Sequence, residues 1–83
     1  MTLDLADGVG LLGSALMVVA YAYSNVTQQV DFVFFNALNL IGAMLLLASL
    51  LVHFNLASLL LEIVWSLIAL AGLVKALRER ARA

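Results

Sequence analysis

The residues best suited to chemistry are a single acid and a few amides that lie inside otherwise apolar segments. Glu62 lies in the apolar run from Asn55 to Lys75, and Ile63, Val64 and Trp65 follow it directly. A carboxyl group at that place in a membrane is costly and usually has a function. No Lys, Arg or His lies near it in the run, so loss of hydration favours the neutral acid, which both donates and accepts hydrogen bonds.

Two helical faces carry the other candidate residues. Asn36, Asn39 and Ala43 follow one another at three- and four-residue steps, which places them on one face of a helix. In the third run the polar or small residues recur at the same steps, while leucines fill the lipid side. The two faces are predicted to meet. The candidate substrate-binding residues are Glu62, Asn39, Asn36, Trp65 and Ser66.

Each candidate has a structural interpretation beside the functional one. Glu62 and Asn39 could form a polar clasp between helices, or the acid could bind a substrate or a proton. Trp65 suits packing as well as stacking on a sugar ring. His53, in the turn before the third run, is expected to be solvated. The chain has no cysteine and one histidine, so we expect no metal site and no cofactor.

Other functional classes lack their residues. No nucleophile and base are paired in the sequence, so we expect no enzyme. Nothing resembles a phosphate-binding loop or a nucleic-acid surface, so we expect no nucleic-acid partner.

Composition indicates which environment these residues occupy. Hydrophobic residues make up 66% of the 83-residue chain and charged residues 11%, against about 25% charged in a typical soluble domain. The mean hydropathy is +1.18 and no proline is present, as expected for uninterrupted helices in lipid. The sequence therefore predicts an all-α membrane protein whose main partner is the lipid bilayer.

The apolar runs predict three helices in one transmembrane domain, residues 1–83. The helices are expected at about 7–23, 32–52 and 56–75, followed by a basic tail at 76–83. Asp7, Asp31 and Asn55 are the expected N-caps. The short turn at 53–55 makes the second and third helices antiparallel neighbours.

The basic residues predict the orientation, because cytoplasmic segments retain Lys and Arg. All four follow the third helix: Lys75, Arg78, Arg80 and Arg82. We therefore expect the C-terminus to be cytoplasmic and the N-terminus to lie outside.

The chain resembles the SemiSWEET sugar transporters in four features taken together. These are three apolar helices, an outside N-terminus, a hairpin between the second and third helices, and a polar residue midway along the third helix. The resemblance places Glu62 at the position of that family's third-helix asparagine. The family's first-helix proline–glutamine pair has no counterpart here, and Leu46 takes the place of its pocket tryptophan. The chain more closely resembles small uncharacterised bacterial membrane proteins through Asn39-Leu40-Ile41-Gly42 and Glu62-Ile63-Val64-Trp65. That resemblance implies a fold and little about activity, and we expect the protein in the bacterial inner membrane.

Three helices alone enclose no pathway, so transport would require an oligomer. A parallel homodimer about an axis along the membrane normal would surround a central cavity with two copies of Glu62, as the parallel repeats of SWEET-type folds do. We therefore expect a homodimeric transporter of a small polar solute, with Glu62 as the substrate or proton site. The alternative is a non-transporting accessory or assembly subunit that docks on a larger membrane protein through its small residues.

Overall fold

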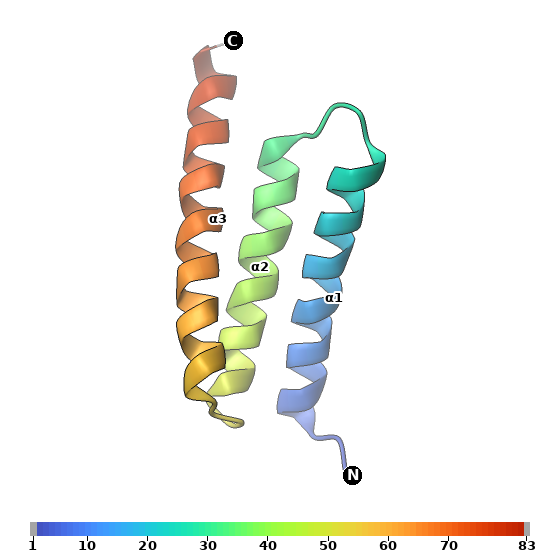
Figure 1. The fold of residues 1–83 in the computed structure, drawn as a ribbon, viewed down its shortest axis with the longest axis vertical. Helices are drawn as coiled ribbons and strands as arrows, with labels where there is room; N and C mark the ends of the chain where they lie inside the picture. Colours follow the sequence, from blue (N-terminus) through green and yellow to red (C-terminus); the bar gives the residue numbers. More distant parts are fainter. Residues whose placement is uncertain (1, 83) are drawn as a thin grey trace.

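The chain forms three antiparallel helices that run up, down and up. The structure, a computed structural model, describes residues 2–82, and its helices are α1 (Leu5–Val26), α2 (Phe32–Leu50) and α3 (Leu56–Arg82). The start of α1 and the α2–α3 turn lie at one end, here called the turn end (Figure 1). The α1–α2 loop and the end of α3 lie at the opposite end, here called the tail end.

All three helices are long and apolar enough to cross a membrane. Most of their large side chains point away from the protein: Leu12, Ile41 and Leu60, for example, are each more than half exposed. Leucine and isoleucine on that outer surface are stable in lipid and unstable in water. The chain is therefore an integral membrane protein with three candidate spans, and the predicted all-α architecture is confirmed.

The beginning of α1 differs from the expected one. Asp4, and not Asp7, is the N-cap, because the two aspartates are three residues apart and form a reciprocal capping box. The Asp7 backbone N–H donates to Asp4 Oδ1 at 2.8 Å, and the Asp4 N–H donates to Asp7 Oδ2 at 3.1 Å. The other two predicted caps are confirmed: Asp31 accepts from Val33 N–H, and Asn55 accepts from Ser58 N–H.

Helix α3 continues beyond the expected boundary near Lys75. Its last residues are alanine, leucine, arginine and glutamate with no glycine or proline, all of which favour a helix. The basic tail is therefore helical up to Arg82. At the other end of the hairpin α2 stops at Leu50, and the next residues form a turn in which Val52 N–H donates to the Ser49 carbonyl.

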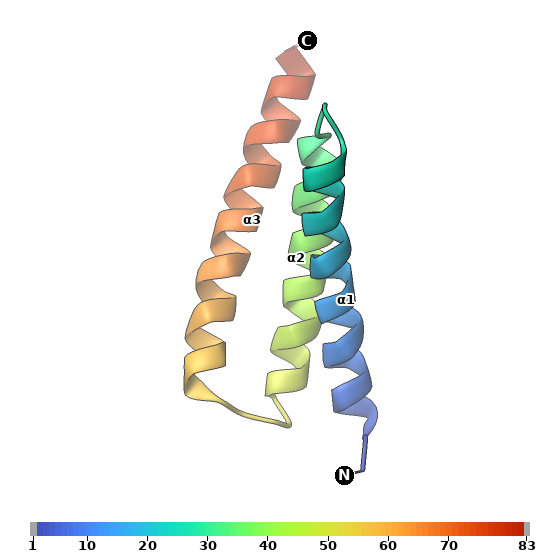
Figure 2. The ribbon, with the colours of Figure 1, turned by 45° about the vertical axis from the view of Figure 1, so that its right-hand side comes forward.

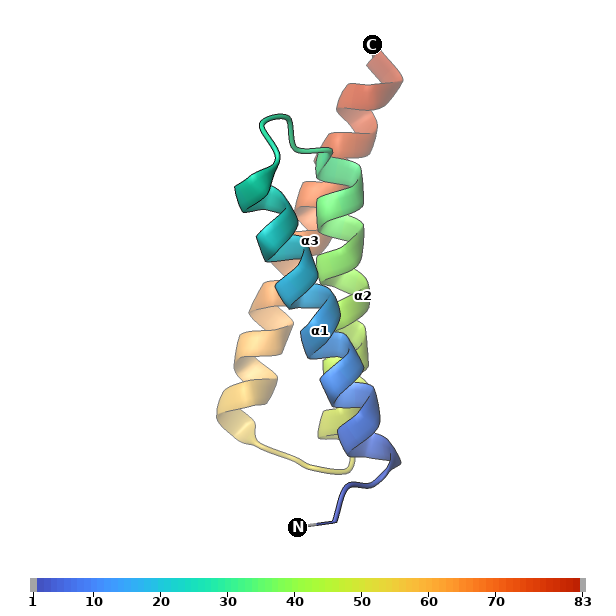
Figure 3. The same cartoon turned by 90° about the vertical axis from the view of Figure 1, so that its right-hand side faces the viewer.

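Helix α2 packs against both of the others, whereas α1 and α3 do not contact each other within the described residues. The α1–α2 contact is closest at Gly13 and Gly42, where a Cβ added to Gly13 would lie 2.6 Å from the Gly42 carbonyl oxygen. Two views show α3 diverging from α2 toward the turn end (Figures 2 and 3). The bundle is consequently open on the side where α1 faces α3.

Candidate functional site

The polar centre of the α2–α3 interface is a hydrogen bond between Asn39 and Trp65. The Trp65 indole Nε1–H donates to Asn39 Oδ1 at 3.3 Å. The amide Nδ2 of Asn39 donates to the Phe35 carbonyl at 3.0 Å, four residues earlier on the same helix. Asn39 is 5% exposed, so both ends of its amide are satisfied inside the protein, as burial of a polar group requires.

A groove runs past this hydrogen bond, and we call it the amide groove. One hollow of about 190 Å³ is lined by Phe35, Asn36, Asn39, Trp65, Ile68 and Ala69. An adjoining hollow of about 470 Å³ shares three of these residues and reaches α1; it is lined by Met17, Val18, Tyr21, Phe35, Asn39 and Trp65. The groove is therefore bounded by all three helices. Its lining is mainly apolar and aromatic, and its polar groups are the two amides, the Tyr21 hydroxyl and the Trp65 indole N–H.

Asn36 sets the closest approach between α2 and α3. Its Nδ2 donates to the Phe32 carbonyl at 2.8 Å. Its Oδ1 lies over Gly72, where an added Cβ would come within 2.6 Å. A side chain at position 72 would therefore require the Asn36 amide to move.

Glu62 and Ser66 lie elsewhere, on the buried face of α3, one turn apart. Their exposed fractions are 8% and 9%. Glu62 Oε2 and Ser66 Oγ are both fully buried and have no hydrogen-bond partner. The structure therefore brings Asn36, Asn39 and Trp65 together in the amide groove but does not include Glu62 or Ser66 among the residues that line it.

The expected hydrogen bond between Glu62 and Asn39 is not formed. The antiparallel register sets Asn36 against Gly72 and Asn39 beside Trp65. Glu62 is therefore level with a later stretch of α2, Ala43–Ala48, in which every residue is apolar. The residue types predicted that the polar faces of α2 and α3 point toward each other. Which residue of α3 meets Asn39 depends on how far the two helices are shifted along each other.

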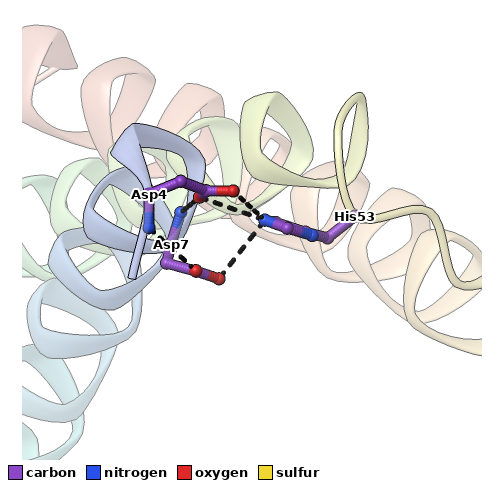
Figure 4. A group of neighbouring side chains, drawn as sticks. All are labelled: Asp4, Asp7 and His53. Carbon is purple, nitrogen blue, oxygen red and sulfur yellow. Dashed lines mark hydrogen bonds and ion pairs between the residues drawn. The ribbon is translucent and has the colours of Figure 1, made fainter. Parts of the chain in front are cut away.

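A second polar cluster lies at the turn end and comprises Asp4, Asp7 and His53 (Figure 4). His53 Nε2 lies 2.9 Å from Asp4 Oδ2 and 3.4 Å from Asp7 Oδ1. The hydrogen bond to Asp4 raises the pKa of His53. The Asp7 backbone N–H, followed by His53, lowers the pKa of Asp4. The cluster therefore ties the start of α1 to the α2–α3 turn when His53 is protonated.

The three turn-end side chains are close enough to hold a cation. One ligand atom from each lies within 4.8 Å of the others. The side chains are partly exposed, at 47% for His53 and 49% for Asp4, and an ion pair already explains their geometry. The sequence predicts a solvated His53, and residue spacing gives no sign of its pairing with the aspartates. The predicted topology contained the necessary signal, since it placed the N-terminus and the 53–55 turn on the same side.

An ion pair between Arg80 and Asp31 joins the helices at the tail end. Arg80 donates to Asp31 Oδ1 at 2.9 Å. The Phe34 backbone N–H, and then Arg80, lower the pKa of Asp31. The Tyr23 hydroxyl accepts from the Asp31 backbone N–H at 2.8 Å. The sequence interpretation missed this pair, which forms because α3 remains helical as far as Arg80.

A protein-family model matches residues 6–80, from the first turn of α1 to the end of α3. The chain belongs to that family. The match includes all three apolar helices and both connections between them. No curated protein and no solved structure matches the chain. The resemblance to the SemiSWEET transporters therefore stays a prediction.

The members of this site differ in the chemistry that they offer. The amide groove offers aromatic rings to a small molecule, together with two amides that already hydrogen-bond within α2. Glu62 offers a carboxyl group that can hold or release a proton in an apolar setting. The turn-end cluster and the Arg80–Asp31 pair hold the ends of the helices together.

Proposed function

We propose that the protein is a homodimeric carrier of a small polar solute, with Glu62 as its substrate or proton site. The observation that supports this most strongly is the buried Glu62 carboxyl oxygen that lacks a hydrogen-bond partner. Leaving such a group unsatisfied costs about 1–3 kcal/mol. A residue that only stabilises the fold is not expected to leave a buried oxygen unsatisfied. A residue that binds a substrate or a proton is, because the ligand then satisfies that oxygen.

The amide groove fits the solute in this proposal. Asn36 and Asn39 supply amide groups, and Trp65 supplies a ring face on which a sugar or polyol could stack. The two hollows of the groove have volumes of about 190 and 470 Å³, and small-molecule sites enclose roughly 300–1,000 Å³. This size suits a small solute. Binding and movement, rather than catalysis, would be the activity.

A second copy of the chain would complete the pathway. Because α1 and α3 do not contact each other, the amide groove is open between them. A partner related by an axis along the membrane normal would cover that side, in the arrangement that the SemiSWEET resemblance implies. Crosslinking in native membranes tests this: a dimer supports the proposal, and a chain that stays monomeric at all protein concentrations contradicts it.

The proposed orientation has the turn end outside and the tail end in the cytoplasm of a bacterium. The basic residues of α3, which lie at the tail end, support it. The chain has no cysteine, so single cysteines can be introduced at Phe54 and Gln28. An impermeant maleimide added to intact cells is expected to label the first and not the second. Labelling of Gln28→Cys alone would reverse the orientation.

The alternative is an accessory or assembly subunit that docks on a larger membrane protein. Its expected docking surface consisted of small residues, but Gly10, Gly13 and Gly42 are buried in the α1–α2 contact. Gly72 lies against Asn36 in the same chain. These glycines therefore serve the fold and do not form the docking surface expected of the subunit. Purification from native membranes with a stoichiometric larger partner would favour the subunit instead.

The decisive experiment is uptake into proteoliposomes. Radiolabelled glucose, glycerol and glutamine serve as probes, and Glu62→Gln is compared with the wild type and with Glu79→Gln. Glu79 is the other glutamate of the chain and is exposed at the tail end, so the same substitution there controls for a general effect. Loss of uptake in Glu62→Gln alone supports the proposal. Equal uptake and pH dependence in all three proteins would exclude a chemical role for Glu62.

A further inference from the structure

Two buried polar atoms without partners lie one helical turn apart on α3, and both are separate from the amide groove. They are Glu62 Oε2 and Ser66 Oγ. We infer that Glu62, assisted by Ser66, is the proton-binding site of the carrier, while the solute binds separately in the amide groove. This inference rests on the proposed function and decides between the two roles that it leaves to Glu62.

The number of available ligand atoms favours a proton over a metal cation. A hard cation such as Ca²⁺ takes six to eight oxygen ligands. The buried face of α3 offers one carboxyl and one hydroxyl group, since the helix carbonyls accept hydrogen bonds within the helix. The stretch of α2 level with them, Ala43–Ala48, has no side-chain oxygen. A proton needs one basic atom, and Glu62 supplies it.

No other charge competes for this proton. Helix α2 has no titratable residue from Phe32 to Leu50, and α1 does not contact α3. On α3 itself the nearest charged residue is Lys75, about 20 Å away along the helix at 1.5 Å per residue. The bound proton therefore neutralises the site completely. Without it, an unpaired carboxylate would face aliphatic side chains, which is strongly unfavourable.

The position of Glu62 connects its proton to the groove. Trp65 follows it by three residues, so the two side chains lie within one turn of the same helix. Trp65 also bonds to Asn39 across the groove. In this proposal an ionised Glu62 turns from its apolar surroundings toward water, and α3 shifts with it. Proton binding would therefore hold the Trp65–Asn39 contact closed, and proton release would open it.

Isotope labelling can observe this proton directly, because the chain has two glutamates, Glu62 and Glu79. Protein labelled with ¹³C at the glutamate carboxyl is reconstituted in phosphatidylcholine vesicles and titrated by solid-state NMR, with Glu79→Gln to assign the signals. At pH 7 the Glu62 signal is expected at the neutral-acid position. The Glu62 titration should be the same in sodium and in choline chloride. An ionised Glu62 at pH 7, or a signal that moves with sodium, overturns the inference.

A hydroxyl deletion tests the part assigned to Ser66. Ser66→Ala should displace the Glu62 titration midpoint, because the hydroxyl can donate to the carboxylate as it forms. Ser14→Ala is the matched control, since Ser14 lies on α1 and bonds to the Gly10 carbonyl. Identical midpoints in the wild type and both variants would remove Ser66 from the site.

Failure of the proton site and failure of the carrier give different results. Vesicles loaded with a pH dye report proton movement during uptake of glucose, glycerol or glutamine. Uptake with proton movement in the wild type, and neither in Glu62→Gln, supports both proposals. Uptake without proton movement overturns the coupling and leaves the carrier. A neutral, titrating Glu62 in a protein that takes up none of the probes leaves the proton site and counts against the carrier.

Discussion

The Trp65 indole donates to Asn39 Oδ1 across the α2–α3 interface at 3.3 Å, although the two residues are 26 positions apart in sequence. Among residues 2–82, α3 packs on α2 and not on α1, so a polar contact there bears directly on its position. The contact also forms the shared wall of both hollows of the amide groove. Stability and the shape of the groove therefore depend on the same hydrogen bond.

A double-mutant cycle measures this hydrogen bond. Asn39→Ala and Trp65→Phe are made singly and together, and the free energy of unfolding is measured in bicelles. Hydrogen bonds between membrane helices average about 0.6 kcal/mol and reach about 1.7 kcal/mol, so a coupling energy in that range is expected. Strictly additive effects of the two substitutions would show that the indole and the amide do not interact.

The sequence was sufficient to predict the helices and most of their caps. The apolar runs are long, Asp31 and Asn55 precede them directly, and no proline interrupts them. The register between α2 and α3 could not be predicted in the same way, because it depends on close packing at a few points. Gly72 fits under Asn36, and this fit sets Asn39 beside Trp65 and not beside Glu62. Periodicity shows which residues share a face but not which residues on the facing helix they meet.

The ion pairs at the two ends were missed for a related reason. His53 and Asp4 are 49 positions apart, as are Arg80 and Asp31. Sequence spacing cannot detect such pairs, but topology can, since antiparallel helices return the chain to the same end. The Arg80–Asp31 pair also forms only because α3 remains helical through its charged end. The basic residues in that segment indicated a tail and not a helix.

A methyl group added at Gly13 tests the close contact between α1 and α2. The added Cβ would lie 2.6 Å from the Gly42 carbonyl oxygen, so the helices must separate. Gly13→Ala is expected to lower the free energy of unfolding by about 1–3 kcal/mol, the usual cost of overpacking. Steric-trapping measurements in bicelles can determine this value.

Gly8→Ala is the matched control for that substitution. Nothing lies within 4 Å of a Cβ at Gly8, and alanine favours a helix over glycine by up to about 1 kcal/mol. We therefore expect Gly8→Ala to be neutral or stabilising. Equal losses at Gly8 and Gly13 would mean that the α1–α2 backbone contact does not determine stability.

The turn-end cluster should make stability depend on pH. Hydrogen bonding to Asp4 raises the pKa of His53 above 6.5, so its contribution is complete below pH 6.5 and is lost as the pH rises through the folded-state pKa. The pKa of Asp4 is lowered below 3.8, so its contribution is present above pH 3.8 and is lost as the pH falls through the lowered pKa. The stabilisation is therefore greatest between these limits.

Thermal unfolding of His53→Gln between pH 4 and 9 tests this dependence. The variant should unfold at a lower temperature than the wild type near pH 5.5, and the two curves should converge at high pH. Arg80→Gln removes the ion pair at the other end and is the control, since that pair contains no histidine and the pKa of Asp31 is lowered. A constant difference between His53→Gln and the wild type at all pH values would contradict an ion pair.

Glu62→Leu should separate stability from function. The carboxyl oxygen Oε2 is buried without a partner, level with an entirely apolar stretch of α2. Replacing an unsatisfied polar group by an apolar one of similar size is often stabilising, so the variant is expected to gain about 1 kcal/mol in the free energy of unfolding while losing uptake. Glu62→Gln should lose uptake without that gain, because its amide is also unsatisfied. Protein stability is measured in bicelles and uptake in proteoliposomes from the same preparation. A Glu62→Leu variant that is much less stable than the wild type would mean that the acid has a structural partner, and its role as a proton site would then have to be abandoned.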